Sequence, residues 1–300
     1  MPAFRLLGAQ FAIGASAIFA RFALEGAGPF AVSALRLGIA ALLALAVARR
    51  LTPLSRGREG AFALAGLALA VHFATWIASL TYTSVAISTL LVTTTPVWTE
   101  LYEVMRFRRA PTRAYVFAVA LALAGVALIA LQRDTPAPQP GHTALGAALA
   151  LIGSLAIGAY LIVVRDASSL PDGTGLATRA IVARTYAWSA LALALAATCA
   201  HEGPPSTSAI AAWGGILAMA LVSQLLGHTA LNAALRDFSP STIALSTLLE
   251  PVIAALLGIV LLRERIAPTA IAGGVLVLLA IATALRSNAD ADRVRVAEES

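Results

Sequence analysis

Residues 246–258, "STLLEPVIAALLG", place Glu250 and Pro251 inside a stretch of chain that is otherwise apolar. Proline lacks the amide proton that a helix needs, and an ionised carboxylate is costly to place in hydrocarbon. A second segment, "LLVTTTPVWTELY" at 90–102, has a similar interruption at Pro96, which lies 155 residues before Pro251. Two interrupted apolar segments at matching places indicate a chain built from two related halves.

The composition is that of a membrane protein. The chain has 300 residues, of which 59% are apolar and 12% charged, and its mean hydropathy is +0.85. A soluble protein carries about 25% charged residues. Apolar stretches of about 20 residues, each long enough to cross a bilayer core of about 30 Å, recur along the whole length. We therefore predict an all-α integral membrane protein.

Apolar runs between charged or turn-forming clusters predict ten transmembrane helices. Their approximate bounds are 5–23, 29–48, 60–80, 85–105, 113–131, 143–164, 178–199, 208–232, 240–262 and 267–285. The segment "QRDTPAPQPGH" at 132–142 is rich in proline and polar residues and separates the spans five and five. The predicted division is a first repeat at 1–133, an extracytoplasmic linker at 134–142, a second repeat at 143–286 and a cytoplasmic tail at 287–300.

The basic residues predict how the chain is oriented. All 21 of them are arginine, and the net charge is +6. Placing both termini in the cytoplasm leaves fifteen arginines beside cytoplasmic helix ends and four beside outer ends, as the positive-inside rule requires. We therefore expect a multi-pass protein of the cell membrane, the inner membrane in a bacterium, with its charge serving orientation and not nucleic-acid binding.

The two halves repeat in sequence. A shift of 155 residues aligns "ASLTYTSVAISTLLVTTTPV" at 78–97 with "AALRDFSPSTIALSTLLEPV" at 233–252. The two prolines, the preceding turn and a later "APT" recur in the same order. Because each half has an odd number of spans, the second half enters the membrane from the opposite side. This predicts two inverted five-helix repeats, a plan from which many secondary transporters are built.

Several short motifs carry a family resemblance over residues 5–285. The run "PFAVSALR" at 29–36, the mid-helix prolines, and "LLRERIAPT" at 261–269 followed by a glycine-rich span resemble the EamA-type branch of the drug/metabolite transporter superfamily. The resemblance implies a fold of two five-helix repeats. It also implies export of small metabolites, with the exporters of amino acids, aromatic ones included, as the first substrate class.

Polar and aromatic residues inside the spans are the candidates for a substrate pathway, because hydrocarbon cannot satisfy polar groups. They follow stripes at helical spacing on the third, fourth, eighth and ninth spans, with one aromatic on the seventh. The predicted pathway residues are His72, Trp76, Ser79, Tyr82, Thr93, Tyr102, Trp188, Gln224, His228, Asn232, Ser246 and Glu250. The alternative for the hydroxyl and amide side chains is ordinary hydrogen bonding between helices.

Two further pairs lie at corresponding places in the halves. Pro96 and Pro251 are candidate gating kinks, with an inherited packing kink as the alternative. Arg36 and Arg184 are candidate contacts for a substrate carboxylate or phosphate, with anchoring at the membrane interface as the alternative. Glu250 either carries a coupled proton or pairs with an arginine or histidine.

The sequence favours a transporter that exports small organic metabolites, most of all amino acids, by alternating access. The alternatives are proton-coupled efflux of cationic drugs and, from another class, an intramembrane enzyme or a sensor subunit. We expect no catalytic constellation, metal site or cofactor. The expected partners are a small-molecule substrate and the lipid bilayer, without nucleic acid, and the sequence is compatible with a monomer.

Overall fold

The computed structural model describes residues 2–83, 85–108, 110–130, 142–168, 176–262, 268–269, 271–280 and 283. Throughout these residues the ordered elements are helices. The linker residues 134–141 and the tail 287–300 lie outside the described residues.

Within the described residues, the bundle contains thirteen labelled α-helices and two segments of other helix types. They are α1 (Pro2–Gly14), α2 (Ser16–Leu24), α3 (Pro29–Ala48), α4 (Arg56–Tyr82), α5 (Val85–Val92), α6 (Thr95–Phe107), α7 (Arg113–Ala130), α8 (Thr143–Ser168), α9 (Thr178–Cys199), α10 (Ile210–Ala218), the π-helix η1 (Met219–His228), α11 (Thr229–Ala234), α12 (Pro240–Ser246), the 3-10 helix η2 (Thr247–Leu249) and α13 (Glu250–Leu262). A further apolar helix covers Ile271–Ala280.

These helices correspond to the ten predicted spans. Six stretches within the described residues are long and apolar enough to cross a membrane: Phe4–Leu24, Pro29–Ala48, Arg56–Tyr82, Ala144–Ser168, Thr178–Cys199 and Ile210–Ala234. The shorter α7, the α5–α6 pair, the α12–η2–α13 run and helix 271–280 supply the remaining four. The prediction of an all-helical fold of two repeats is confirmed. The fourth and ninth spans are interrupted next to Pro96 and Pro251, as the sequence indicated. Two features were not predicted: the first span is divided into α1 and α2, and the eighth contains the π-helix η1.

Local sequence fixes where several helices begin. Ser55 precedes α4, and its hydroxyl accepts a hydrogen bond from the Arg58 amide at 3.4 Å. Ser239 does the same for α12, accepting from the Thr242 amide at 3.2 Å, and Pro240 follows it in the first turn. Side-chain caps satisfy amides that have no partner within the helix, and proline is tolerated in the first turn because its missing amide proton is not needed there.

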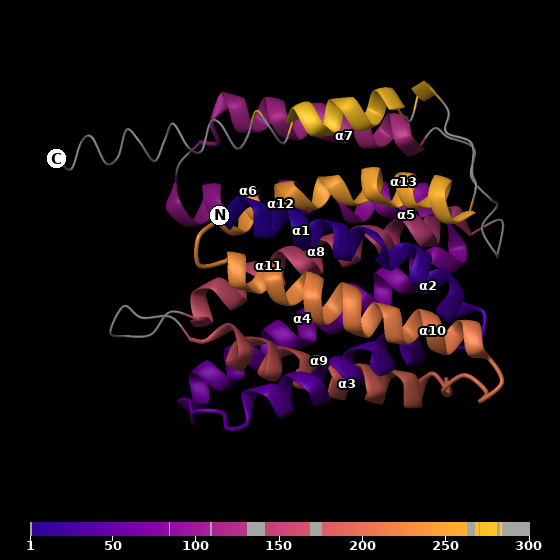
Figure 1. Cartoon of the computed structure of the whole chain (residues 1–300). Coiled ribbons are helices and arrows are strands. Elements are labelled where there is room, and N and C mark those ends of the chain that lie inside the picture. The colour runs from indigo at the N-terminus through magenta and orange to yellow at the C-terminus, as the bar shows by residue number, and fades with distance from the viewer. Residues whose placement is uncertain are drawn as a thin grey trace.

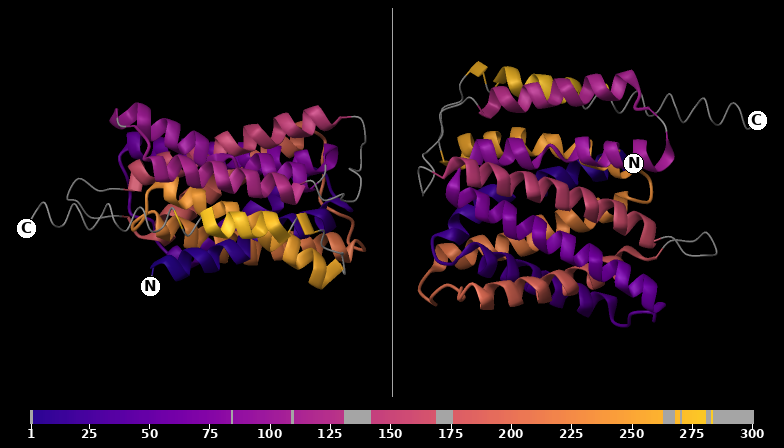
Figure 2. Two further views of the ribbon diagram at one scale, coloured as in Figure 1. Left: turned by 90° about the horizontal axis from the view of Figure 1, so that it is seen from above. Right: turned by 180° about the vertical axis from the view of Figure 1, so that it is seen from behind.

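The helices lie roughly side by side in a stack (Figure 1). α3 and α9 form one edge of the stack, whereas α7 and helix 271–280 form the other. The view from behind shows the same order (Figure 2). A large apolar core joins α1–α4 with α8, α9 and η1, and a smaller core joins α7, η2, α13 and helix 271–280.

Contacts between the halves are reciprocal, as two related repeats require. α4 of the first half lies along α8 of the second, and α10 and η1 of the second half lie along α2 and α1 of the first. α5 and α6 also contact α8, and correspondingly α12 and α13 contact α1. α3 contacts its own counterpart, α9. Each half therefore completes its packing only against the other.

Close approach of backbones at glycines sets several of these contacts. A Cβ atom on Gly215 of α10 would come within 2.5 Å of the carbonyl oxygen of Phe19, and one on Gly125 within 2.6 Å of that of Gly273. Membrane helices lack a hydrophobic drive to associate, so tight packing at small residues supplies much of their affinity.

The neighbouring glycines Gly214 and Gly215 provide a test of this packing. We expect Gly215→Ala to destabilise the protein by about 1–3 kcal/mol, because its new methyl group meets the backbone of α2. Gly214→Ala is the matched control, since nothing lies within 4 Å of a Cβ atom there. Thermal unfolding of detergent-purified protein measures both, and equal melting temperatures would contradict the packing described.

Orientation is tested by labelling single cysteines. With Cys199 replaced by serine, Thr207→Cys tests the loop between α9 and α10, and Arg50→Cys tests the loop between α3 and α4. We expect a membrane-impermeant maleimide to label Thr207→Cys in intact cells and Arg50→Cys only after permeabilisation, because the arginine distribution places residue 50 in the cytoplasm. The reverse pattern would overturn the predicted orientation.

Candidate functional site

The two interrupted spans break at equivalent positions. α6 begins at Thr95 and α13 at Glu250, so each helix starts one residue before its proline, 155 residues apart. The fourth span breaks at the turn formed by residues 93–94, and the ninth passes through the 3-10 turn of η2. The prolines at the start of helices α6 and α13 thus mark two mid-span discontinuities.

Neighbouring residues satisfy the backbone at these breaks. Pro96 cannot donate to the carbonyl of Val92, and the Thr95 hydroxyl donates to that carbonyl instead, at 2.9 Å. At the second break, the carbonyl of Thr247 accepts from the amide of Glu250. Because lipid cannot hydrate a free carbonyl, each proline is accompanied by a substitute donor.

The two breaks meet at a central cavity. Its wall is contributed by both halves, from α1, α2, α4, α5, α6, α8, η1, η2 and α13 and from the turn before α6. The lining residues are Ile13, Ser16, His72, Phe73, Trp76, Val92, Thr93, Thr95, Ile157, His228, Thr247 and Glu250. Five of the predicted pathway residues, His72, Trp76, Thr93, His228 and Glu250, are therefore brought together here.

In this conformation the cavity is contracted. Its volume of about 40 Å³ suffices for a few water molecules, since one water needs about 10–15 Å³. Sites for drug-sized ligands have volumes of about 300–1,000 Å³. An organic solute therefore enters only if the surrounding helices separate.

Four rings form the aromatic part of the site. The rings of His72 and Trp76 are nearly parallel, with centroids 6.2 Å apart, and Phe73 meets His228 edge to face at 5.2 Å. The Nδ1 of His72 lies 2.9 Å from the carbonyl oxygen of Gly153, so this nitrogen donates and the ring is held against α8.

Several polar groups at the cavity have no partner. The indole nitrogen of Trp76 and Nδ1 of His228 are buried, and neither makes a hydrogen bond with any described residue. The half-buried carboxylate of Glu250 also lines the cavity, and Arg36 interacts with it electrostatically. Buried polar groups in proteins are nearly always paired, so the two unpaired nitrogens of Trp76 and His228 point to a ligand or to water in the cavity.

Arg36 lies directly behind the cavity wall and is fully buried. Its Nε donates to Gln224 Oε1 at 3.0 Å and its Nη1 to Ser16 Oγ at 3.1 Å. The guanidinium carbon lies 3.9 Å from the centroid of the Phe73 ring. Its Nη2 and the Nε2 of Gln224 have no partner among the described residues. Because Arg36 is fully buried, it does not fit the alternative of an arginine that anchors its helix at the membrane interface.

Ser79, Asn232 and Ser246, like Gln224, are buried but do not line the cavity. Ser79 lies 2.6 Å from the Ser88 hydroxyl. Asn232 accepts from Tyr160, and Ser246 accepts from Gln10, both at 2.7 Å. These contacts fit the alternative of hydrogen bonds between helices.

Four more predicted site residues lie apart from the cavity. Tyr102 donates to Asp166 at 3.5 Å, and the Tyr82 ring lies edge to face with His142, the centroids 6.1 Å apart.

The other two are on α9. Arg184 forms an ion pair with Glu59 at 3.0 Å and also donates to the Thr52 carbonyl. Trp188 is 39% exposed and donates to the same glutamate at 3.1 Å. Arg184 therefore fastens α9 to α4, whereas its counterpart Arg36 adjoins the cavity.

Ser16, Phe73 and Thr247 line the cavity and were not among the predicted site residues. Phe73 directly follows His72 in the chain, and Ser16 and Thr247 are intramembrane hydroxyls, so each carried a signal. What the sequence does not give is which hydroxyls of different helices converge. Among the described residues, no group of three or more histidine, cysteine, aspartate or glutamate side chains is arranged to hold a metal ion.

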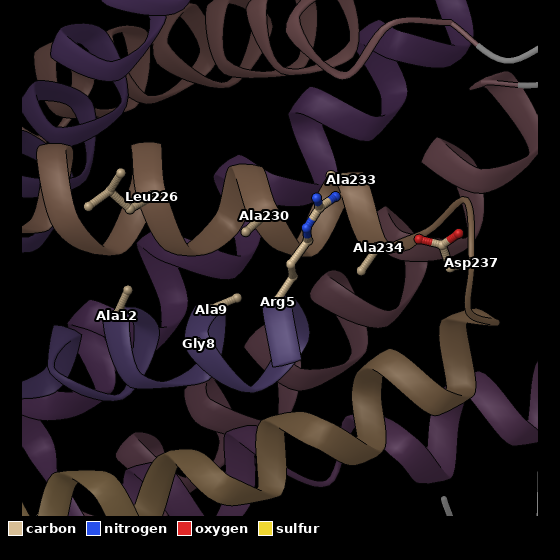
Figure 3. Close-up of a pocket in the computed structure, with 9 residues that line it drawn as sticks. All are labelled: Arg5, Gly8, Ala9, Ala12, Leu226, Ala230, Ala233, Ala234 and Asp237. Atoms are coloured by element: carbon tan, nitrogen blue, oxygen red, sulfur yellow. The ribbon is translucent and has the colours of Figure 1, made fainter. Parts of the chain in front are cut away.

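A second, larger cavity of about 370 Å³ lies between α1 and the η1–α11 segment (Figure 3). Alanines and a glycine form most of its wall, with Arg5 and Asp237 near one end. It shares no lining residue with the central cavity.

Comparisons with known proteins agree with this architecture. The model of the EamA-like transporter family matches the chain twice, at residues 2–131 and 144–286. A solved structure titled "Crystal structure of protein" superposes with a TM-score of 0.74, covering 94% of this chain and 96% of its own, at 15% identity, which shows a shared fold. A search of curated proteins gives no match. With both halves matched, this chain belongs to the EamA-like transporter family.

Proposed function

We propose that this protein exports amino acids, aromatic ones included, by alternating access through the central cavity. Family membership implies transport of a small molecule across the bilayer. The observation that supports a specific site is the convergence of both helix breaks on one cavity with aromatic, imidazole and carboxylate walls. A solute with an apolar side chain and charged ends suits such a wall.

In the proposed cycle, the halves of the broken spans move relative to the helices that they contact. A site of about 40 Å³ opens first to one side of the membrane and then to the other. Breaks at Thr95 and Glu250 allow α5 and α6, or α12 and α13, to tilt independently. We place the termini in the cytoplasm, so that export carries substrate from the side of residue 50 to the side of residue 207.

Transport by purified protein in liposomes tests this function. Vesicles loaded with an unlabelled amino acid should accumulate the labelled amino acid by exchange, tested with phenylalanine, tyrosine, leucine and lysine in turn. Protein-free vesicles and vesicles carrying Gly215→Ala, matched for inserted protein, give the background and a packing control. Absence of exchange for every amino acid tested would refute the proposal.

Proton-coupled efflux of cationic drugs is the second candidate, since Glu250 lines the cavity. In that case, an imposed pH gradient should drive accumulation of a lipophilic cation, and Glu250→Gln should abolish the response. We expect amino-acid exchange to proceed without a gradient in wild type and in Glu250→Gln, with weaker apparent affinity in the variant because Glu250 lines the cavity.

Two tryptophans allow the assigned cavity to be tested, because Trp76 lines it and Trp188 does not. We expect Trp76→Ala and His72→Ala to lower apparent substrate affinity about 3- to 10-fold, because each removes a ring of the wall. Trp188→Ala, remote from the cavity, is the control and should leave affinity unchanged. Exchange kinetics per folded molecule provide the measurement, and equal effects of Trp76→Ala and Trp188→Ala would argue against the assigned cavity.

The break at Pro251 yields a kinetic prediction. Pro251→Ala restores a backbone donor and should straighten the ninth span, so exchange should slow while equilibrium substrate binding stays near wild type. Pro240→Ala alters the first turn of α12 and not the break, and serves as the control. Wild-type exchange rates in Pro251→Ala would rule out gating at this position.

A further inference from the structure

One buried cation lacks an acidic hydrogen-bond partner. Within the described residues, the guanidinium of Arg36 donates only to neutral side chains, Gln224 and Ser16, and its Nη2 donates to nothing. Burying a charge without an ionic partner is unfavourable, and proteins keep such groups where a ligand supplies the missing charge. Arg36 therefore requires an explanation beyond packing.

The neighbours of Arg36 connect it to the cavity. Ser16, which accepts from Nη1, and Phe73, which lies under the guanidinium, both line the cavity. These two side chains are the layer between the arginine and the space where a solute would bind. A modest displacement of Phe73, or of α2 carrying Ser16, would present Nη1 and the unpaired Nη2 to the cavity.

The opposite charge lies on the cavity wall itself. Glu250 lines the cavity at the start of α13, and its carboxylate interacts with Arg36 electrostatically, without a direct hydrogen bond between the two side chains within the described chain. The unpaired indole nitrogen of Trp76 adds a neutral donor to the lining. The site thus combines one cation, one anion and spare donors, with no direct ion pair between the two charges.

We propose that the central cavity recognises a zwitterion, with the substrate carboxylate bound by Arg36 and the substrate ammonium by Glu250. This inference rests on the proposed function and narrows it to solutes that carry both charges close together. A planar carboxylate accepts two parallel bonds from a guanidinium, so Nη1 exchanges Ser16 for the substrate and Nη2 gains its partner. The buried guanidinium and the half-buried carboxylate then each bind an opposite charge directly.

The same arrangement excludes singly charged analogues. An amine without the carboxylate leaves Arg36 uncompensated, and an N-acylated acid leaves Glu250 uncompensated. A site built to bond a particular polar group rejects the analogue that lacks it much more strongly than a site that reads only shape. Selection against both analogues is therefore the signature that separates this site from a general aromatic pocket.

Arg184 offers a matched control for Arg36. It is the corresponding arginine of the second half, it is also buried, and it is already paired with Glu59. It does not line the cavity. A change at Arg184 therefore reports what removal of a buried arginine does to the fold without altering the proposed site.

The experiment measures competition against labelled phenylalanine exchange by phenylalanine, phenylalaninamide and N-acetylphenylalanine. In wild type we expect both derivatives to compete at least about tenfold more weakly than phenylalanine. Arg36→Gln should bring phenylalaninamide to within about twofold of phenylalanine, and Glu250→Gln should do so for N-acetylphenylalanine. Arg184→Gln should keep both wild-type ratios. Equal competition by the derivatives in wild type, or unchanged ratios in folded Arg36→Gln, would overturn the proposal.

A direct measurement of binding tests the proposed zwitterion site independently of transport. Thermal stabilisation of the purified protein by the same three compounds needs no exchange, and Arg36→Lys replaces Arg36→Gln if the latter does not fold. Arg36→Lys keeps the charge but loses the planar fork, so the preference for phenylalanine over its amide should shrink. Zwitterion-selective stabilisation without exchange would refute the proposed export and support this site. Amino-acid exchange without selectivity for the zwitterion would support the proposed export and refute this site.

Discussion

Every backbone polar group within the bilayer needs a partner from the protein, and this constraint governs the structure. Continuous helices such as α3, α4, α8 and α9 meet it through their own backbone hydrogen bonds. The two proline-interrupted spans meet it with substitute donors, the Thr95 hydroxyl at one break and the Glu250 amide at the other. Where such breaks adjoin each other, the helices cannot close completely, and a polar cavity remains between them.

The reciprocal contacts of the repeats turn these two breaks into one site. Because α8 lies against α4–α6, and α1 and α2 lie against η1, α10 and α13, each half supplies the walls that the other lacks. Neither half buries its polar stripe alone. The site is consequently a product of the interface between repeats, and this places its charged groups far apart in sequence, at Arg36 and Glu250.

Much of this architecture could be predicted from the sequence, because hydropathy reflects the bilayer directly and the 155-residue repeat reflects the two related halves. The candidate site was harder to predict. Helical spacing places His72, Trp76 and Ser79 on one face of the third span. His72 and Trp76 do line the cavity, whereas Ser79 instead forms a hydrogen bond with Ser88. Periodicity shows which residues share a face and not which neighbouring helix that face meets. Arg36 and Arg184 look alike in sequence, and only their tertiary partners distinguish them.

Thr95 and Glu250 occupy equivalent positions in the two repeats but differ in charge. Exchanging the conformations of two identical inverted repeats would convert one open state into the equivalent state that faces the other side of the membrane, at equal energy. Side-chain differences such as this one remove that degeneracy. In the alternating-access cycle proposed above, a preference for one side therefore arises at positions where the two halves differ in sequence.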